Sequence, residues 1–278
     1  MNFIKLLESL SDKEALTKKS SRRDSFQQIK GFGKNVALAA VPFGLAASSS
    51  KARAATFMAA QEDTTAVLNF ALTLEYLEKE FYNLGLESGV IDDDDMLVFE
   101  TISKHEDAHV EFLLAALKEN AVAKPTFDFT GAPGGLDLDP FMKKDGTTKE
   151  MAYMQFMALA QGFEDTGVRA YKGQALALSS NNDLLDYGLQ IHSVEARHAS
   201  QVRRMRKEKG WITNAENTLP APFAAIYAGE DNTNQGGVEL KGMFGDFGGD
   251  KALTEAFDEP LPKEDVLAIG GIFIVKDA

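Results

Sequence analysis

Two short stretches of the sequence repeat one pattern, a glutamate followed three residues later by a histidine. The stretch SKHEDAHVEF contains Glu106 and His109, and the stretch HSVEARHASQ contains Glu195 and His198. Both pairs therefore read Glu-x-x-His, and they use two of the four histidines in the chain. Residues three apart on a helix lie on one face about one turn apart, so the two side chains of each pair can reach the same bound group.

Each Glu-x-x-His also follows an earlier glutamate at a fixed distance. Glu75 precedes Glu106 by 31 residues, and Glu164 precedes Glu195 by 31 residues. A tyrosine lies seven residues after each of these earlier glutamates: Tyr82 and Tyr171. One Glu-x-x-His arises easily by chance, but two in the same setting indicate an internal repeat of a site.

Four long amphipathic helices are predicted to carry these residues. They span residues 62–86, 95–119, 148–179 and 183–209. The connections after the first and third helices are short, which predicts two antiparallel hairpins. The middle connection is rich in Gly and Pro and long enough to run the length of a bundle. The sequence therefore predicts an all-α fold, a four-helix bundle of two hairpins joined by one long crossover.

The core face of each predicted helix is apolar at both ends and ionisable in the middle, which is the wrong composition for a plain bundle core. Buried carboxylates left unpaired would cost on the order of several kcal/mol each. Two divalent cations would offset four carboxylates, and carboxylate with imidazole suits iron or manganese. We predict a two-metal site with Glu106 and Glu195 as bridging carboxylates. Its ligands would be Glu75, Glu106, His109, Glu164, Glu195 and His198.

Five further residues are expected around this site: Tyr82, Tyr171, Glu78, His192 and Asp165. Glu78 lies on the same face as Glu75 and could replace it as a ligand. Its counterpart in the repeat is Gly167, which favours Glu75 and makes Glu78 a supporting or solvated residue.

The two tyrosines would hydrogen-bond the site carboxylates or pack in the core. His192 would orient a ligand or pack, and Asp165 would accept a hydrogen bond near the site. His105 lies about 100° around the helix from Glu106, which favours a surface or groove histidine.

Charge and composition restrict the function. The net charge of −13 argues against nucleic acid as a partner, because phosphate binding needs a basic face. The chain has no cysteine, which excludes disulfides, thiolate metal sites and a cysteine nucleophile.

The first 54 residues differ from the rest, with ten Lys or Arg against four Asp or Glu. They contain the pair Arg22 and Arg23, a short apolar run and then Ala52-Arg53-Ala54, the order found in export signals. The apolar run is too short to span a membrane, so no integral membrane span is expected. The paired arginines resemble a twin-arginine signal, although Phe26 lies one residue later than that motif places it. We expect export to the periplasm or the exterior.

The ligand pattern resembles the ferritin-like superfamily of dinuclear carboxylate proteins. Within it, the stretches NFALTLEYLEKEFYNLGL and AFDEPLPKEDVLAIGGIFIV resemble exported ferritin-like proteins often called desiccation-related. The resemblance covers roughly residue 60 to the end of the sequence. The bundle is expected at residues 55–210 and a C-terminal extension at residues 211–278. The final apolar stretch would pack on the bundle or form a contact in a homo-oligomer.

Two functions fit the expected ligands. A redox enzyme would let the metal pair react with oxygen or peroxide, as a ferroxidase or a catalase does. A non-catalytic stress protein would use the metal pair to stabilise the bundle.

Overall fold

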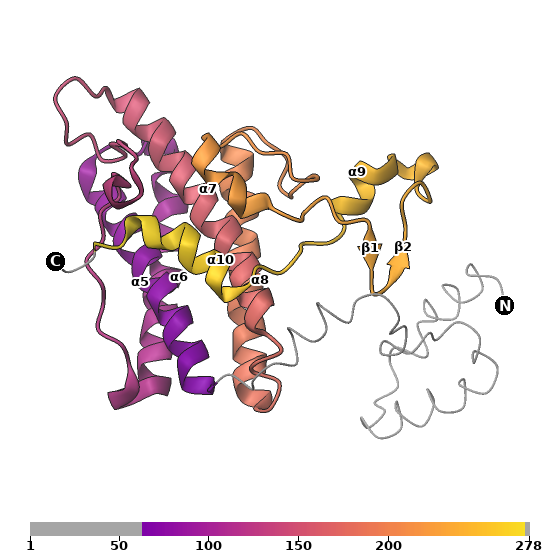
Figure 1. Ribbon diagram of the computed structural model, residues 1–278. Helices are drawn as coiled ribbons and strands as arrows, with labels where there is room; N and C mark the ends of the chain where they lie inside the picture. The colour runs from indigo at the N-terminus through magenta and orange to yellow at the C-terminus, as the bar shows by residue number, and fades with distance from the viewer. Residues whose placement is uncertain (1–62, 276–278) are drawn as a thin grey trace, which may run out of the picture. The chain divides into compact units, whose positions relative to one another are not determined.

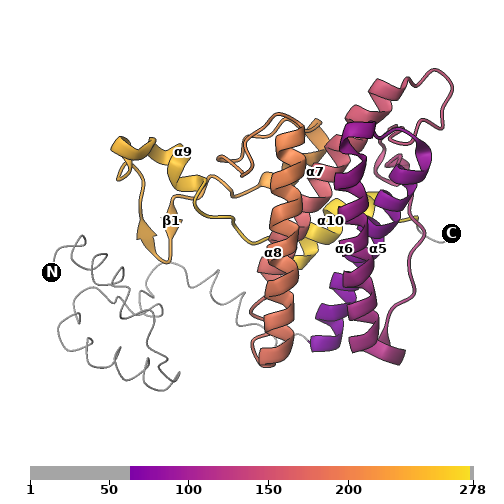
Figure 2. The same ribbon diagram turned by 180° about the vertical axis from the view of Figure 1, so that it is seen from behind.

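Four long helices dominate residues 63–275, the part of the chain that the computed structural model describes (Figure 1). They are α5 (Thr64–Ser88), α6 (Asp93–Leu117), α7 (Lys149–Gln174) and α8 (Asn182–Met205). α5 packs along α6, α7 packs along α8, and α5 also contacts α7. Figures 1 and 2 show the four helices side by side from opposite directions. The predicted all-α bundle of two hairpins is confirmed.

Local capping explains where the helices begin and end. The side chain of Asp63 accepts a hydrogen bond from the backbone N–H of Thr65 at 3.0 Å, and Gly89 ends α5 in the left-handed conformation with a φ of 74°. The side chain of Asn181 caps the start of α8. The third helix ends at Gln174 rather than at the predicted residue 179. Residues 175–180 form turns, and the next helix begins after the cap residue Asn181.

The remaining elements are short and lie in the crossover or in the C-terminal extension. Their bounds are η1 Lys118–Asn120, η2 Ala132–Gly134, η3 Ala221–Tyr227, β1 Asn234–Gln235, β2 Val238–Glu239, η4 Gly245–Phe247, α9 Gly249–Thr254, α10 Lys263–Gly270 and η5 Gly271–Phe273. The strands β1 and β2 pair antiparallel with Asn234 opposite Glu239.

The C-terminal extension is held on α7 by buried polar side chains. Arg169 donates hydrogen bonds to the carbonyl oxygens of Ile226, Ala228 and Glu259, and its Nε lies 2.7 Å from a carboxylate oxygen of Glu230. A buried guanidinium needs such partners because its charge cannot be lost. Residues 226–259 are therefore tied to the bundle by specific contacts.

The end of the chain also joins the bundle. A Cβ atom at Gly173 would lie 2.1 Å from the carbonyl oxygen of Leu261, so only glycine allows this approach. Further on, the fully buried ring of Phe273 packs edge-on against Phe163 of α7, with ring centroids 5.1 Å apart. The backbone N–H of Asp128 in the crossover donates to the carbonyl oxygen of Phe273 at 2.8 Å. The extension thus completes the core beside α7.

Candidate metal centre

The six predicted ligands meet in the middle of the bundle. α5 and α7 contribute one glutamate each, and α6 and α8 contribute one Glu-x-x-His each. All six are buried, with at most 8% of the surface of any one exposed: Glu75, Glu106, His109, Glu164, Glu195 and His198. Burying this many ionisable groups together is costly unless they are paired or hold a cation.

Two overlapping groups of possible metal ligands form within this cluster. One contains Glu75, Glu106, His109 and Glu195, and the other contains Glu106, Glu164, Glu195 and His198. In each group, one ligand atom from every residue lies within 4.8 Å of the others. Glu106 and Glu195 belong to both groups, so the cluster has two halves that share two carboxylates.

The Nδ1 atom of each histidine faces the carboxylates. In the first half, Nδ1 of His109 lies 3.1 Å from Glu75, 3.1 Å from Glu106 and 3.2 Å from Glu195. In the second half, Nδ1 of His198 lies 3.0 Å from Glu106, 3.3 Å from Glu164 and 3.8 Å from Glu195. The repeat in the sequence is thus a repeat in space.

Several buried atoms of the cluster have no hydrogen-bond partner among the described residues. They are Oε1 of Glu106, Oε2 of Glu164, both carboxylate oxygens of Glu195 and Nδ1 of His198. Buried polar atoms in folded proteins are nearly always paired with protein, water or an ion. Oxygen and imidazole nitrogen are the ligand atoms that iron and manganese accept. The residues present therefore fit divalent metal binding.

Each tyrosine of the repeat crosses to the opposite hairpin. Tyr82 on α5 donates a hydrogen bond to Oε1 of Glu164 on α7 at 2.5 Å, and Tyr171 on α7 donates to Oε1 of Glu75 on α5. Oε2 of Glu75 lies 3.1 Å from Nδ1 of His109, and Oε2 of Glu164 lies 3.3 Å from Nδ1 of His198. The tyrosines therefore occupy one oxygen of each terminal glutamate and leave the other facing the cluster.

The protein without metal must hold protons in this cluster. Burial and the charge of Glu195 raise the pKa of Glu106, and burial raises the pKa of Glu164 to about 7. Burial also acts on Glu195, but the close contacts with His109 and His198 outweigh it and lower the pKa of Glu195 to about 2. Burial opposes protonation of His109, yet its close contacts with three carboxylates raise its pKa to about 12.

Glu78 is buried beside the cluster, which excludes the solvated alternative and leaves the supporting one. Burial raises its pKa, and the charges of Glu195 and Glu164 add to the effect more than those of the other cluster glutamates. A Cβ atom at Gly167 would lie 3.4 Å from Oε1 of Glu78. The position that corresponds to Glu78 in the repeat is therefore a glycine without a side chain. Glu78 itself belongs to neither ligand group.

His105 contacts the site directly, although the sequence favoured a surface or groove histidine. The residue is exposed, yet its Nδ1 lies 2.8 Å from Nε2 of His198. The position 89 residues further on, which corresponds to it in the repeat, is Val194. The helix angle placed His105 away from the core face, and only the approach of α8 reveals that it reaches His198.

Two other expected supporting residues form no hydrogen bond to the cluster in the described part of the chain. Asp165 accepts hydrogen bonds from Arg203 at 2.7 Å and from Tyr227 at 2.7 Å, so it joins α8 and the extension to α7. Nε2 of His192 is buried without a hydrogen-bond partner. The charge of Asp165 is satisfied by the buried guanidinium of Arg203, which the sequence pattern did not predict.

A family model described as a ferritin-like domain matches residues 63–208, more than half of the chain. The protein therefore belongs to the ferritin-like family. No curated protein matches the chain. Among the described helices, none is both long and apolar enough to cross a membrane.

Proposed function

We propose that the protein binds two divalent ions, iron or manganese, in this cluster and uses them to reduce dioxygen or peroxide. The observation that carries the proposal is the pair of overlapping ligand groups that share Glu106 and Glu195. A carboxylate that faces both groups can bind both ions. Glu75 with His109 would complete one position, and Glu164 with His198 would complete the other.

Charge supports the count of two ions. Two divalent ions carry +4, which offsets four ionised glutamates and leaves both imidazoles neutral. A single divalent ion would leave like charges buried side by side, or would require the remaining carboxylates to stay protonated. Two ions also give partners to the unpaired oxygens of Glu106, Glu164 and Glu195.

The surrounding residues orient the ligand side chains. Tyr82 and Tyr171 fix the outer oxygens of Glu164 and Glu75, so each terminal glutamate presents one oxygen to an ion. With its proton on Nε2, neutral His198 would donate a hydrogen bond to Nδ1 of His105 and would keep the lone pair of its own Nδ1 free for metal. When bound, the metal pair supplies two electrons, one from each ion. Two electrons and two protons convert dioxygen to hydrogen peroxide, or hydrogen peroxide to two waters.

Export is a second part of the proposal. It rests on the basic, signal-like segment 1–54 and on the resemblance to exported ferritin-like proteins, and that segment lies outside the described residues. A site that reduces oxygen or peroxide outside the cytoplasm would protect against oxidative stress.

Metal analysis followed by an oxidation assay tests the function. Protein reconstituted with ferrous iron or manganese is expected to hold two ions per chain and to consume dioxygen or peroxide. Glu106→Ala is expected to lose both ions, whereas Glu75→Ala is expected to retain more metal because it serves one position. One ion or none per chain would overturn the two-metal site. Two ions without any turnover would indicate that the metal pair only stabilises the bundle.

A further inference from the structure

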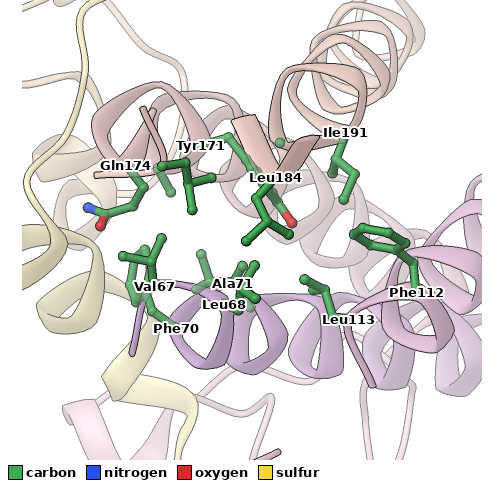
Figure 3. Close-up of a pocket in the computed structure, with 14 residues that line it drawn as sticks. Val67, Leu68, Phe70, Ala71, Phe112, Leu113, Tyr171, Gln174, Leu184 and Ile191 are labelled. Carbon is green, nitrogen blue, oxygen red and sulfur yellow. The ribbon is translucent and has the colours of Figure 1, made fainter. Parts of the chain in front are cut away.

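A small apolar cavity lies directly beside the cluster, one helical turn along the bundle. All four long helices contribute to its wall. Ala71 lies four residues before Glu75, and Ile191 lies four residues before Glu195. Tyr171, whose hydroxyl is bonded to Glu75, also lines the cavity. Figure 3 shows Tyr171, Leu184 and Ile191 facing Ala71 and its neighbours across the open space.

The internal repeat explains why the space is open. At the opposite end of the cluster, three packed aromatic rings fill the core: Phe81, Phe99 and Phe156. The repeat relates positions 89 residues apart, as it relates Glu75 to Glu164. The counterparts of the three phenylalanines all line the cavity and are all smaller: Ala170, Gly188 and Val67. The cavity is therefore the space that three rings occupy in the other half.

The size and chemistry of the cavity select its occupant. Its volume is about 20 Å³, and roughly 10–15 Å³ is enough to hold one water-sized molecule. Among the described side chains that line it, Tyr171 and Gln174 carry the polar atoms. The hydroxyl of Tyr171 is already bonded to Glu75, and the amide of Gln174 lies at the end of the cavity away from Ile191 (Figure 3).

An apolar cavity of this size suits a diatomic gas better than hydrogen peroxide. Peroxide would lose the hydrogen bonds that its two hydroxyl groups make in water, at a cost of roughly 1–3 kcal/mol for each unsatisfied group. Dioxygen makes no such bonds and favours apolar surroundings, as xenon does in apolar protein cavities.

We propose that this cavity admits dioxygen to the half of the cluster formed by Glu75 and His109. The inference rests on the proposed function and deepens it, since it names dioxygen as the oxidant. Tyr171 connects the cavity to the cluster, because its side chain lines the cavity and its hydroxyl donates a hydrogen bond to Glu75.

Xenon binding tests the cavity without any metal chemistry. Crystals of the metal-free protein under xenon pressure are expected to hold xenon between Ala71 and Ile191. Val67→Phe and Ala170→Phe restore the ring found in the other half and are expected to abolish this binding. Leu189→Phe is the matched control, because Leu189 lies on α8 beside Gly188 but is 48% exposed. Thermal melts identify any variant that fails to fold. The two filling variants are tested separately, so that the cavity can still be tested if one of them does not fold.

Oxidation kinetics then test the occupant. In the iron-loaded protein, the filling variants are expected to slow oxidation by dioxygen roughly tenfold and to leave oxidation by peroxide unchanged. No xenon in the parent protein, or equal slowing of both oxidants, would overturn the dioxygen route and leave the metal site standing. Xenon binding together with no oxidation by either oxidant would instead overturn the proposed function, and the dioxygen route with it.

Discussion

The hydroxyl of Tyr82 donates a 2.5 Å hydrogen bond to Glu164, a residue 82 positions away on another helix. Burial and the negative charge of Glu164 raise the pKa of Tyr82, so the phenol keeps its proton and remains a donor. Tyr171 and Glu75 form the same contact in the opposite direction. The two hairpins of the bundle are therefore joined through the candidate site itself.

Tyr82→Phe removes this donor and leaves a buried oxygen of Glu164 without its partner. We expect the free energy of unfolding to fall by about 1–3 kcal/mol. We also expect metal affinity to fall roughly 10- to 100-fold, as it does when a group that orients a ligand is lost. Chemical denaturation and metal titration measure the two effects. Tyr187→Phe, at a position that is 45% exposed, is the control and should change neither.

The two halves of the cluster are expected to bind metal unequally. His105 contacts His198 of the second half, whereas its repeat counterpart is Val194 and offers no such contact to His109. The substitution His105→Val gives this position the residue that its counterpart, Val194, has. Calorimetric titration with manganese should show one of the two binding steps weakened roughly 10- to 100-fold while the other is retained.

Lys104→Ala is the control for His105→Val, since it changes an exposed neighbour on the same helix. If both binding steps weaken equally in His105→Val, or if neither changes, then His105 does not distinguish the halves.

Without metal, stability is expected to fall as the pH rises. The pKa of Glu164 is raised from 4.5 to about 7, so its contribution is complete below pH 4.5 and is lost as the pH rises through about 7. The pKa of His109 is raised from 6.5 to about 12, so its contribution is complete below pH 6.5 and declines toward pH 12. Melting temperatures in a chelator should therefore decrease between about pH 5 and pH 8.

Metal should reverse that trend, because it competes with the protons on the same groups. The rise in melting temperature caused by manganese should be larger at pH 8 than at pH 5.5. A variant with leucine at Glu75, Glu106, Glu164 and Glu195 should show no response to metal. A parent protein that melts at the same temperature with and without manganese at both pH values would contradict a shared metal site.

Export is expected to depend on Arg22 and Arg23. Replacing both with lysine should retain the protein in the cell, because a twin-arginine signal requires the pair. N-terminal sequencing of the exported parent should begin near Ala55. Secretion of the doubly substituted protein at the normal level, or an intact N-terminus on the parent, would contradict this prediction.

The sequence by itself determined the helices and the residues that face the bundle core. Spacings of three and four residues fix which side chains share a helix face, whatever the neighbouring helix is. The equal sequence spacing in the two hairpins then indicated that Glu75 lies beside Glu106 and that Glu164 lies beside Glu195. This is why the six residues of the cluster could be named before the structure.

Only the tertiary structure decided what lies across from those faces. His105 is exposed on its own helix and reaches His198 because α8 packs beside it. Asp165 is hydrogen-bonded to Arg203 because α8 packs along α7, and to Tyr227 because the extension folds back onto α7. The cavity exists because small residues on three helices meet at one level of the bundle. Periodicity describes one helix at a time, whereas these contacts depend on the distances and rotations between helices, which packing of the whole core sets.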